Sequence, residues 1–180
     1  MNKNIMAAST IAQGKSMSPE GKQQIIGYFV EEAKAHLDTI EQRLPNLASR
    51  LDKSWIVNDL LCASHSLAGS AAMLGLDSIY RTGTCLKSCF QILQLEGSVK
   101  VDQKLKTLFM QVFNGLKELV NQLNHPSELA EDKADLLMVE IEPLLGEIKD
   151  YIDVLVKRSQ EETPAFDEEF FSLFDDFLVE

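Results

Sequence analysis

Residues 54–75 read SWIVNDLLCASHSLAGSAAMLG, and this stretch decides the fold. Its apolar residues recur at alternating steps of three and four, which places them in one stripe along a helix. The stripe consists of Ile56, Leu60, Ala63, Leu67, Ala71 and Leu74. Gly75 suits the end of that helix, because glycine adopts the left-handed conformation that often follows a last helical turn. The stretch therefore predicts an amphipathic helix over about 54–74.

Three similar apolar stripes flank this helix, at 26–47, 76–93 and 105–123. Each stripe is one-sided, so each helix needs a shared core to cover it. Short connections between helices favour antiparallel neighbours. We therefore expect an all-α fold, an up-down four-helix bundle over residues 19–125.

Three segments lie outside this bundle. Residues 1–18 are expected to form a flexible N-terminal segment. Residues 126–158 carry a fifth apolar stripe, and Pro143 within it predicts either an additional helix or a kinked helix pair. Residues 159–180 form an acidic, aromatic tail or linker, which either docks to a partner groove or covers the bundle's own surface.

The net charge of -11 is concentrated in the tail, where residues 161–180 hold eight acids and no base. No basic stripe appears, so a nucleic-acid partner is not expected. No apolar run approaches the roughly 20 residues of a membrane helix, and no signal peptide is evident, which predicts a cytoplasmic protein without a membrane partner. The three cysteines lack CxxC spacing, so we expect reduced thiols rather than a disulfide framework or a zinc site. We also expect no other metal and no cofactor.

His65 lies two residues from Leu67, and this spacing turns it about 200° away from the core stripe. Its neighbours on that outer face are small or apolar, where an ordinary solvated face would carry charges: Leu61, Ala68, Gly69 and Ala72. A glycine inside a helix costs about 1 kcal/mol relative to alanine, so Gly69 suggests close approach by another backbone. The pattern predicts an exposed imidazole in a flat apolar patch.

The residues alone leave several interpretations of this face open. A neutral imidazole nitrogen is a good nucleophile near neutral pH, which favours a reactive histidine. Alternatively, His65 is an ordinary surface residue, or the small face packs against the helix expected over 126–158. A thiol–imidazole pair of Cys62 and His65 is a further option, but no third group that would orient the pair is evident.

The run His65 to Leu76, HSLAGSAAMLGL, resembles the motif of histidine phosphotransfer (HPt) domains. The segments 28–41 and 116–119 are also similar to parts of these domains, and the resemblance covers about 20–124. It is most similar in character to the N-terminal phosphotransfer domain of CheA-like hybrid histidine kinases of the cyanobacterial type. The family carries a lysine three residues after the histidine, whereas this chain has Ala68 there.

The resemblance implies that His65 accepts a phosphoryl group in a two-component phosphorelay. The partners would be a histidine kinase catalytic domain and the receiver domain of a response regulator, with the docking patch formed by Leu61, Ala68, Gly69 and Ala72. No nucleotide-binding glycine motif is present, so we expect no intrinsic catalytic activity. Without the family lysine, transfer should be slower or weaker, and Lys87 on the next helix is a candidate replacement charge. The rival interpretations are a non-phosphorylated pseudo-phosphotransfer domain that acts as an interaction module, and a plain structural bundle.

Overall fold

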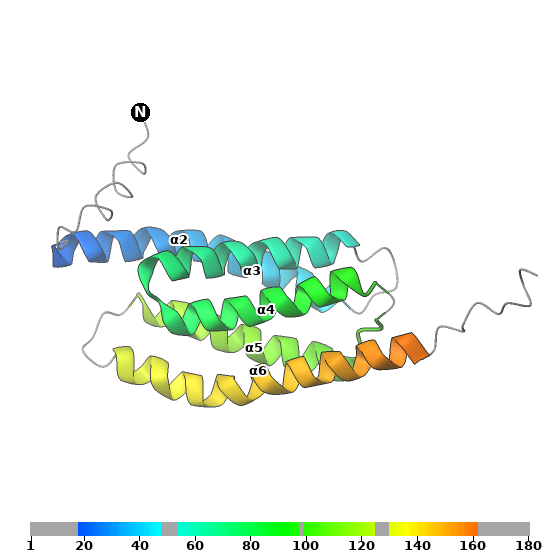
Figure 1. Ribbon diagram of the computed structural model, residues 1–180. Helices are drawn as coiled ribbons and strands as arrows, with labels where there is room; N and C mark the ends of the chain where they lie inside the picture. The colour runs from blue at the N-terminus through cyan, green and yellow to red at the C-terminus, as the bar shows by residue number, and fades with distance from the viewer. Residues whose placement is uncertain (1–17, 48–53, 98, 125–129, 162–180) are drawn as a thin grey trace, which may run out of the picture.

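The computed structural model (Figure 1) describes residues 18–47, 54–97, 99–124 and 130–161. Within these ranges the chain forms five α-helices, one short 3-10 turn and no strand, which confirms the all-helical prediction. The elements are α2 (Pro19–Arg43), η1 (Leu44–Asn46), α3 (Ser54–Leu74), α4 (Asp77–Leu95), α5 (Gln103–Gln122) and α6 (Ala130–Glu161). None of these helices is long and apolar enough to span a membrane.

Local sequence signals set the ends of the helices. At the start of α2, the Ser18 hydroxyl accepts a hydrogen bond from the backbone N–H of Gly21 at 3.2 Å. At the end of α3, Gly75 has a φ of 69°, and the N–H of Leu76 donates to the carbonyl of Ala71 at 3.0 Å. This is a Schellman ending, which only glycine forms without strain, and it lets α4 begin at Asp77. α3 and α4 therefore form a tight helical hairpin.

Four of the helices surround one core. α2 packs against α3, α3 against α4, α4 against α5, and α5 against α2, which closes a ring. In Figure 1, consecutive helices run in opposite directions, as short connections require. α6 lies outside the ring and covers α4 and α5.

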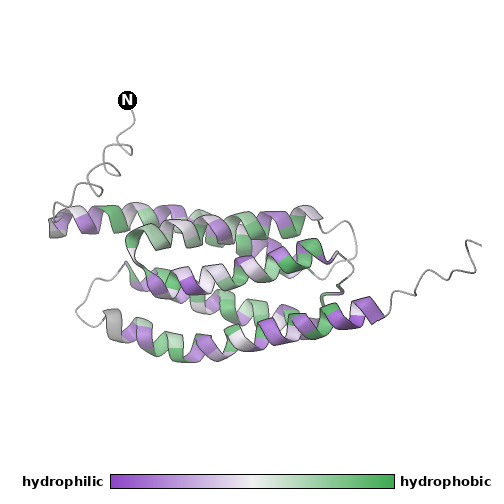
Figure 2. Ribbon diagram, in the orientation of Figure 1, coloured by the Kyte–Doolittle hydropathy of each residue, from purple (hydrophilic) through white to green (hydrophobic). Residues whose placement is uncertain are grey.

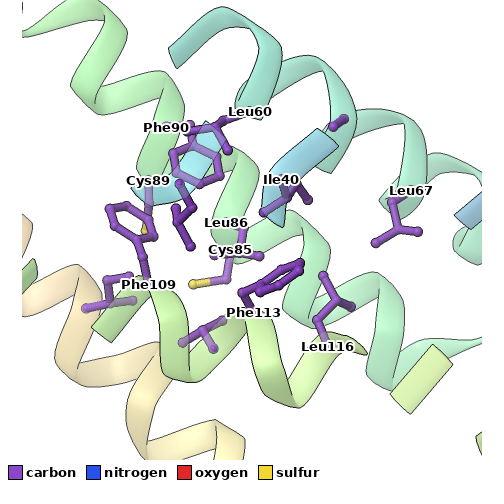
Figure 3. Packing of buried hydrophobic residues seen from close by; sticks show 14 of the residues in the cluster. Ile40, Leu60, Leu67, Cys85, Leu86, Cys89, Phe90, Phe109, Phe113 and Leu116 are labelled. Atoms are coloured by element: carbon purple, nitrogen blue, oxygen red, sulfur yellow. The ribbon is translucent and has the colours of Figure 1, made fainter. Parts of the chain in front are cut away.

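The core consists of the apolar stripes that the sequence predicts. Figure 2 shows hydrophobic and hydrophilic residues alternating along every helix, as expected for one-sided burial. Phe90 of α4 and Phe109 of α5 stack with ring centroids 4.8 Å apart. Figure 3 shows side chains of α2, α3, α4 and α5 converging in this core. The labelled side chains that are fully buried include Ile40, Leu60, Leu67, Leu86, Phe113 and Leu116.

α6, which lies outside the ring, is one helix and not a pair. It continues through Pro143 to Glu161, past the expected boundary at residue 158. It approaches α5 closely at Gly115, where an added Cβ would lie 2.6 Å from Cγ1 of Ile141. Residues 1–17, 125–129 and 162–180 lie outside the described residues, so the expectations for the N-terminal segment and the tail are not addressed by the structure.

Candidate functional site

α3 presents His65 on the surface of the ring. The imidazole is exposed, whereas Leu67 two residues later is fully buried in the core. This is the outcome expected from their angular separation on a helix. Leu74, at the end of the same stripe, is only partly buried, because α3 ends there.

The surface beside His65 has low relief. Gly69 and Ala72, one and two turns further along α3, are both exposed, and Leu61, one turn earlier, is half-buried. No atom lies within 4 Å of where a Cβ on Gly69 would sit, outside its own helix backbone and chain neighbours. A second protein can therefore come close to the backbone of α3 at Gly69, one turn from the imidazole.

Ala68 does not belong to this surface, and the expectation that it lies on the exposed face is wrong. Only 4% of Ala68 is exposed. It lies about 100° from Leu67, on the flank of α3 that α4 covers. A Cβ built on Gly83 of α4 would come within 3.2 Å of the Ala68 Cβ, so the two small residues let the helices approach closely.

Close helix approach therefore occurs at Gly83 rather than at Gly69. The sequence contained a signal for this, because Gly83 occupies a position in the apolar stripe of its helix where a large side chain would be usual. The alternative in which the small face of α3 packs against the helix after residue 126 is also wrong. In the described residues, α6 contacts α4 and α5 and makes no contact with α3.

α3 carries few charged side chains. The helix has no lysine or arginine, and its single acid, Asp59, accepts a hydrogen bond from Arg43 of α2 at 2.9 Å. Ser64, next to His65, is fully buried, and its hydroxyl has no hydrogen-bond partner among the described residues. Positive charge for an anionic group on His65 must therefore come from another helix or from a partner.

The three cysteines are free thiols at different depths in the fold. Cys62 is exposed, whereas Cys85 and Cys89 of α4 are buried. The hydrogen bond with Cys85, together with burial, raises the pKa of the Cys89 thiol, and the same hydrogen bond lowers the pKa of Cys85. Among the described residues, no group of three or more His, Cys, Asp or Glu side chains is placed to hold a metal ion.

These features describe an exposed imidazole on the surface of a helix. An exposed imidazole of this kind can accept a group that another protein activates and delivers. The arrangement offers shape for docking, but α3 itself offers no positively charged side chain.

Comparison with known proteins bears on what this surface does. The model of the Hpt domain family matches residues 24–126, which include almost all of α2 and the whole of α3, α4 and α5. No curated protein and no solved structure matched the chain.

Proposed function

Because the chain belongs to the Hpt domain family, which has a histidine phosphotransfer role in phosphorelays, we propose that His65 accepts the phosphoryl group. The observation that supports this assignment is the exposure of His65 on a face with small neighbours one and two turns on. The other described histidine, His36, is half-buried, and its Nε2 lies 3.8 Å from a carboxylate oxygen of Glu32. Of the two, His65 is the one that a second protein reaches more easily.

The proposed reaction is substitution at phosphorus. An imidazole nitrogen of His65 attacks the phosphorus of an aspartyl phosphate, or of the γ-phosphate of ATP held by a kinase. The N–P bond forms as the P–O bond to the carboxylate or to ADP breaks. Transfer to a receiver aspartate has the same form, with the imidazole as leaving group. The partner supplies the metal ion and the charged groups, so the chain needs no nucleotide site or cofactor of its own.

The docking surface in this proposal is the low-relief part of α3. Leu61 contributes apolar area on one side of His65, while Gly69 and Ala72 keep the other side flat. Ala68 is not part of this docking surface, because its side chain is buried. Its small size still matters indirectly, since it sets how closely α4 flanks the histidine.

We also propose an arrangement of the helices, a set of partners and a cellular place for the chain. Helices α2 to α5 form the up-down four-helix phosphotransfer unit, and α6 is an addition to it. The partners are a histidine kinase catalytic domain and a receiver domain, and the chain works in the cytoplasm, where the kinase binds ATP. The sequence similarity to CheA-like kinases suggests that the unit serves as the first domain of such a kinase.

One observation favours a second candidate, a pseudo-phosphotransfer domain that only binds receivers. The position of the family lysine is Ala68, and its burial excludes it from contact with a phosphoryl group. A domain without that charge could keep the docking surface and lose the chemistry.

A transfer assay separates the two candidates. The chain is mixed with receiver domains from its own organism that carry a ³²P-labelled aspartyl phosphate, and label on the chain is followed over time. We expect label on the parent and on His36→Gln, and none on His65→Gln. Binding of a receiver to the parent without any label on it would support the pseudo-domain instead.

A further inference from the structure

Two contacts fix how α3 and α4 lie against each other. Near the hairpin turn, Ala68 faces Gly83. Nearer the other end, the side-chain amide of Gln94 donates to Oδ1 of Asn58 at 3.4 Å. In an antiparallel pair, each step forward along one helix corresponds to a step back along the other, and both contacts agree with one register.

This register places His65 beside Lys87. His65 comes seven residues after Asn58, and Lys87 comes seven residues before Gln94. Seven residues make nearly two full turns, so each residue stays on the same side of its helix. Two turns along the hairpin from the contact between Asn58 and Gln94, the matching positions are therefore His65 on α3 and Lys87 on α4. Asn58 and Gln94 are exposed and bridge the helices, so His65 and Lys87 lie along the same outer edge of the α3–α4 contact.

Lys87 is also the positive charge on this hairpin that is available to a group on His65. Across residues 54–97, all of which the structure describes, the basic residues are Arg81 and Lys87. Arg81 forms an ion pair with Glu142 of α6, which holds it on the side of α4 away from α3. Lys87 is half-buried and has no ion-pair partner within the described residues. Its flexible four-carbon stem carries three donors that can turn toward an anion.

We propose that Lys87 contacts the phosphoryl group carried on His65 and neutralises part of its charge. This inference rests on the proposed function and adds a residue to it. Attachment of a phosphoryl group brings about -1.5 to -2 charges to the surface of a helix that has no cation of its own. Lys87 reaches that charge from the neighbouring helix, across the edge that the register defines.

The test uses phosphoramidate, a small donor that needs no partner protein. The His65 imidazole attacks its phosphorus, the N–P bond to His65 forms, and ammonia leaves. Three variants are compared with the parent: Lys87→Gln, Lys87→Arg and Lys106→Gln. Lys106 is a matched control, because it is a half-buried lysine on α5, a helix that does not contact α3 in the described structure.

We expect Lys87→Gln to slow labelling of His65 about two- to fivefold at low salt, with a smaller effect at high salt. The pH at which the ³¹P resonance of the phosphohistidine titrates should rise by about 0.3–0.7 unit, because the lysine favours the doubly charged phosphoryl group. Lys87→Arg should restore both values, and Lys106→Gln should change neither.

The outcomes separate the two proposals. If His65 is labelled equally in the parent and in Lys87→Gln, with the same ³¹P titration, the role of Lys87 is refuted and the phosphotransfer function stands. If the parent is not labelled at His65, the proposed function fails and the role of Lys87 fails with it. Circular dichroism of each variant establishes that a slower rate does not come from unfolding.

Discussion

At the scale of single residues, small side chains have two different roles on α3. Gly69 and Ala72 are exposed and keep the surface beside His65 flat. Ala68 is buried and brings α4 close. Sequence spacing alone grouped these three residues, because each lies one or two turns from His65. The difference depends on which flank of the helix the neighbour covers, and a single-helix pattern does not contain that information.

A lysine at position 68 should therefore destabilise the fold instead of improving phosphotransfer. Its stem must leave the contact with Gly83, where an alanine-sized group already fits closely. Overpacking of this kind typically costs about 1–3 kcal/mol. Urea denaturation of Ala68→Lys should show that loss, while Ala72→Lys, on the exposed face, should unfold within about 0.5 kcal/mol of the parent. Equal stability of both variants would contradict the packing described for α3 and α4.

At the scale of elements, the sequence predicts the helices well, because their apolar stripes and end signals are local. The Schellman ending at Gly75 is an example, since the glycine and its position are both visible in the sequence. The continuity of α6 is different. Pro143 allows a kink or a break, and only packing of α6 against α4 and α5 determines that one helix forms.

The start of α5 links two elements through one carboxylate. Asp102 accepts a hydrogen bond from the backbone N–H of Leu105 at 2.9 Å and another from the hydroxyl of Tyr151 of α6. Partial burial acts to raise the pKa of Asp102, but these hydrogen bonds outweigh it and lower the pKa below its ordinary value. Asp102 thus stabilises the fold above its ordinary pKa, and that contribution is lost as pH falls through the lowered value.

Removal of this carboxylate should reduce stability in a pH-dependent way. Asp102→Ala should lower the free energy of unfolding by about 1 kcal/mol at pH 7, as expected for the loss of an N-cap. The gap between parent and variant should begin to narrow below about pH 4, where the carboxylate of the unfolded chain takes up a proton, and should narrow further as pH falls through the lowered pKa of the folded protein. Asp102→Asn is the control, because it keeps a capping oxygen but cannot ionise. A gap for Asp102→Ala that stays constant from pH 7 to pH 2 would refute the role of the ionised form.

At the scale of the whole molecule, α6 covers α4 and α5 and leaves the outer face of α3 free of intramolecular contact with it. The sequence predicts that a fifth helix exists but not where it packs, because its apolar stripe fits any complementary surface. The helix covers the side of the ring away from α3, so α6 does not cover the proposed docking surface.

The open face gives a prediction about partner docking. Gly69→Leu should fold normally, since nothing in the described structure lies within 4 Å of the added Cβ and leucine is a better helix former than glycine. It should nevertheless reduce transfer from a phosphorylated receiver at least tenfold, by blocking approach to His65. Gly27→Leu on α2 is a matched control, because Gly27 is also an exposed helical glycine with open space around it. Parental transfer rates in Gly69→Leu would show that partners do not use this face.

The central claim is that His65 carries the phosphoryl group, and phosphosite mapping tests it most directly. The full chain is phosphorylated with phosphoramidate at neutral pH, digested without exposure to acid, and sequenced by mass spectrometry. Phosphohistidine should form first and predominantly at His65, and His65→Gln should lose this label while keeping the helical content of the parent. Label confined to His36 or His125, or a parent chain that gains none while free imidazole is phosphorylated in the same buffer, would contradict it.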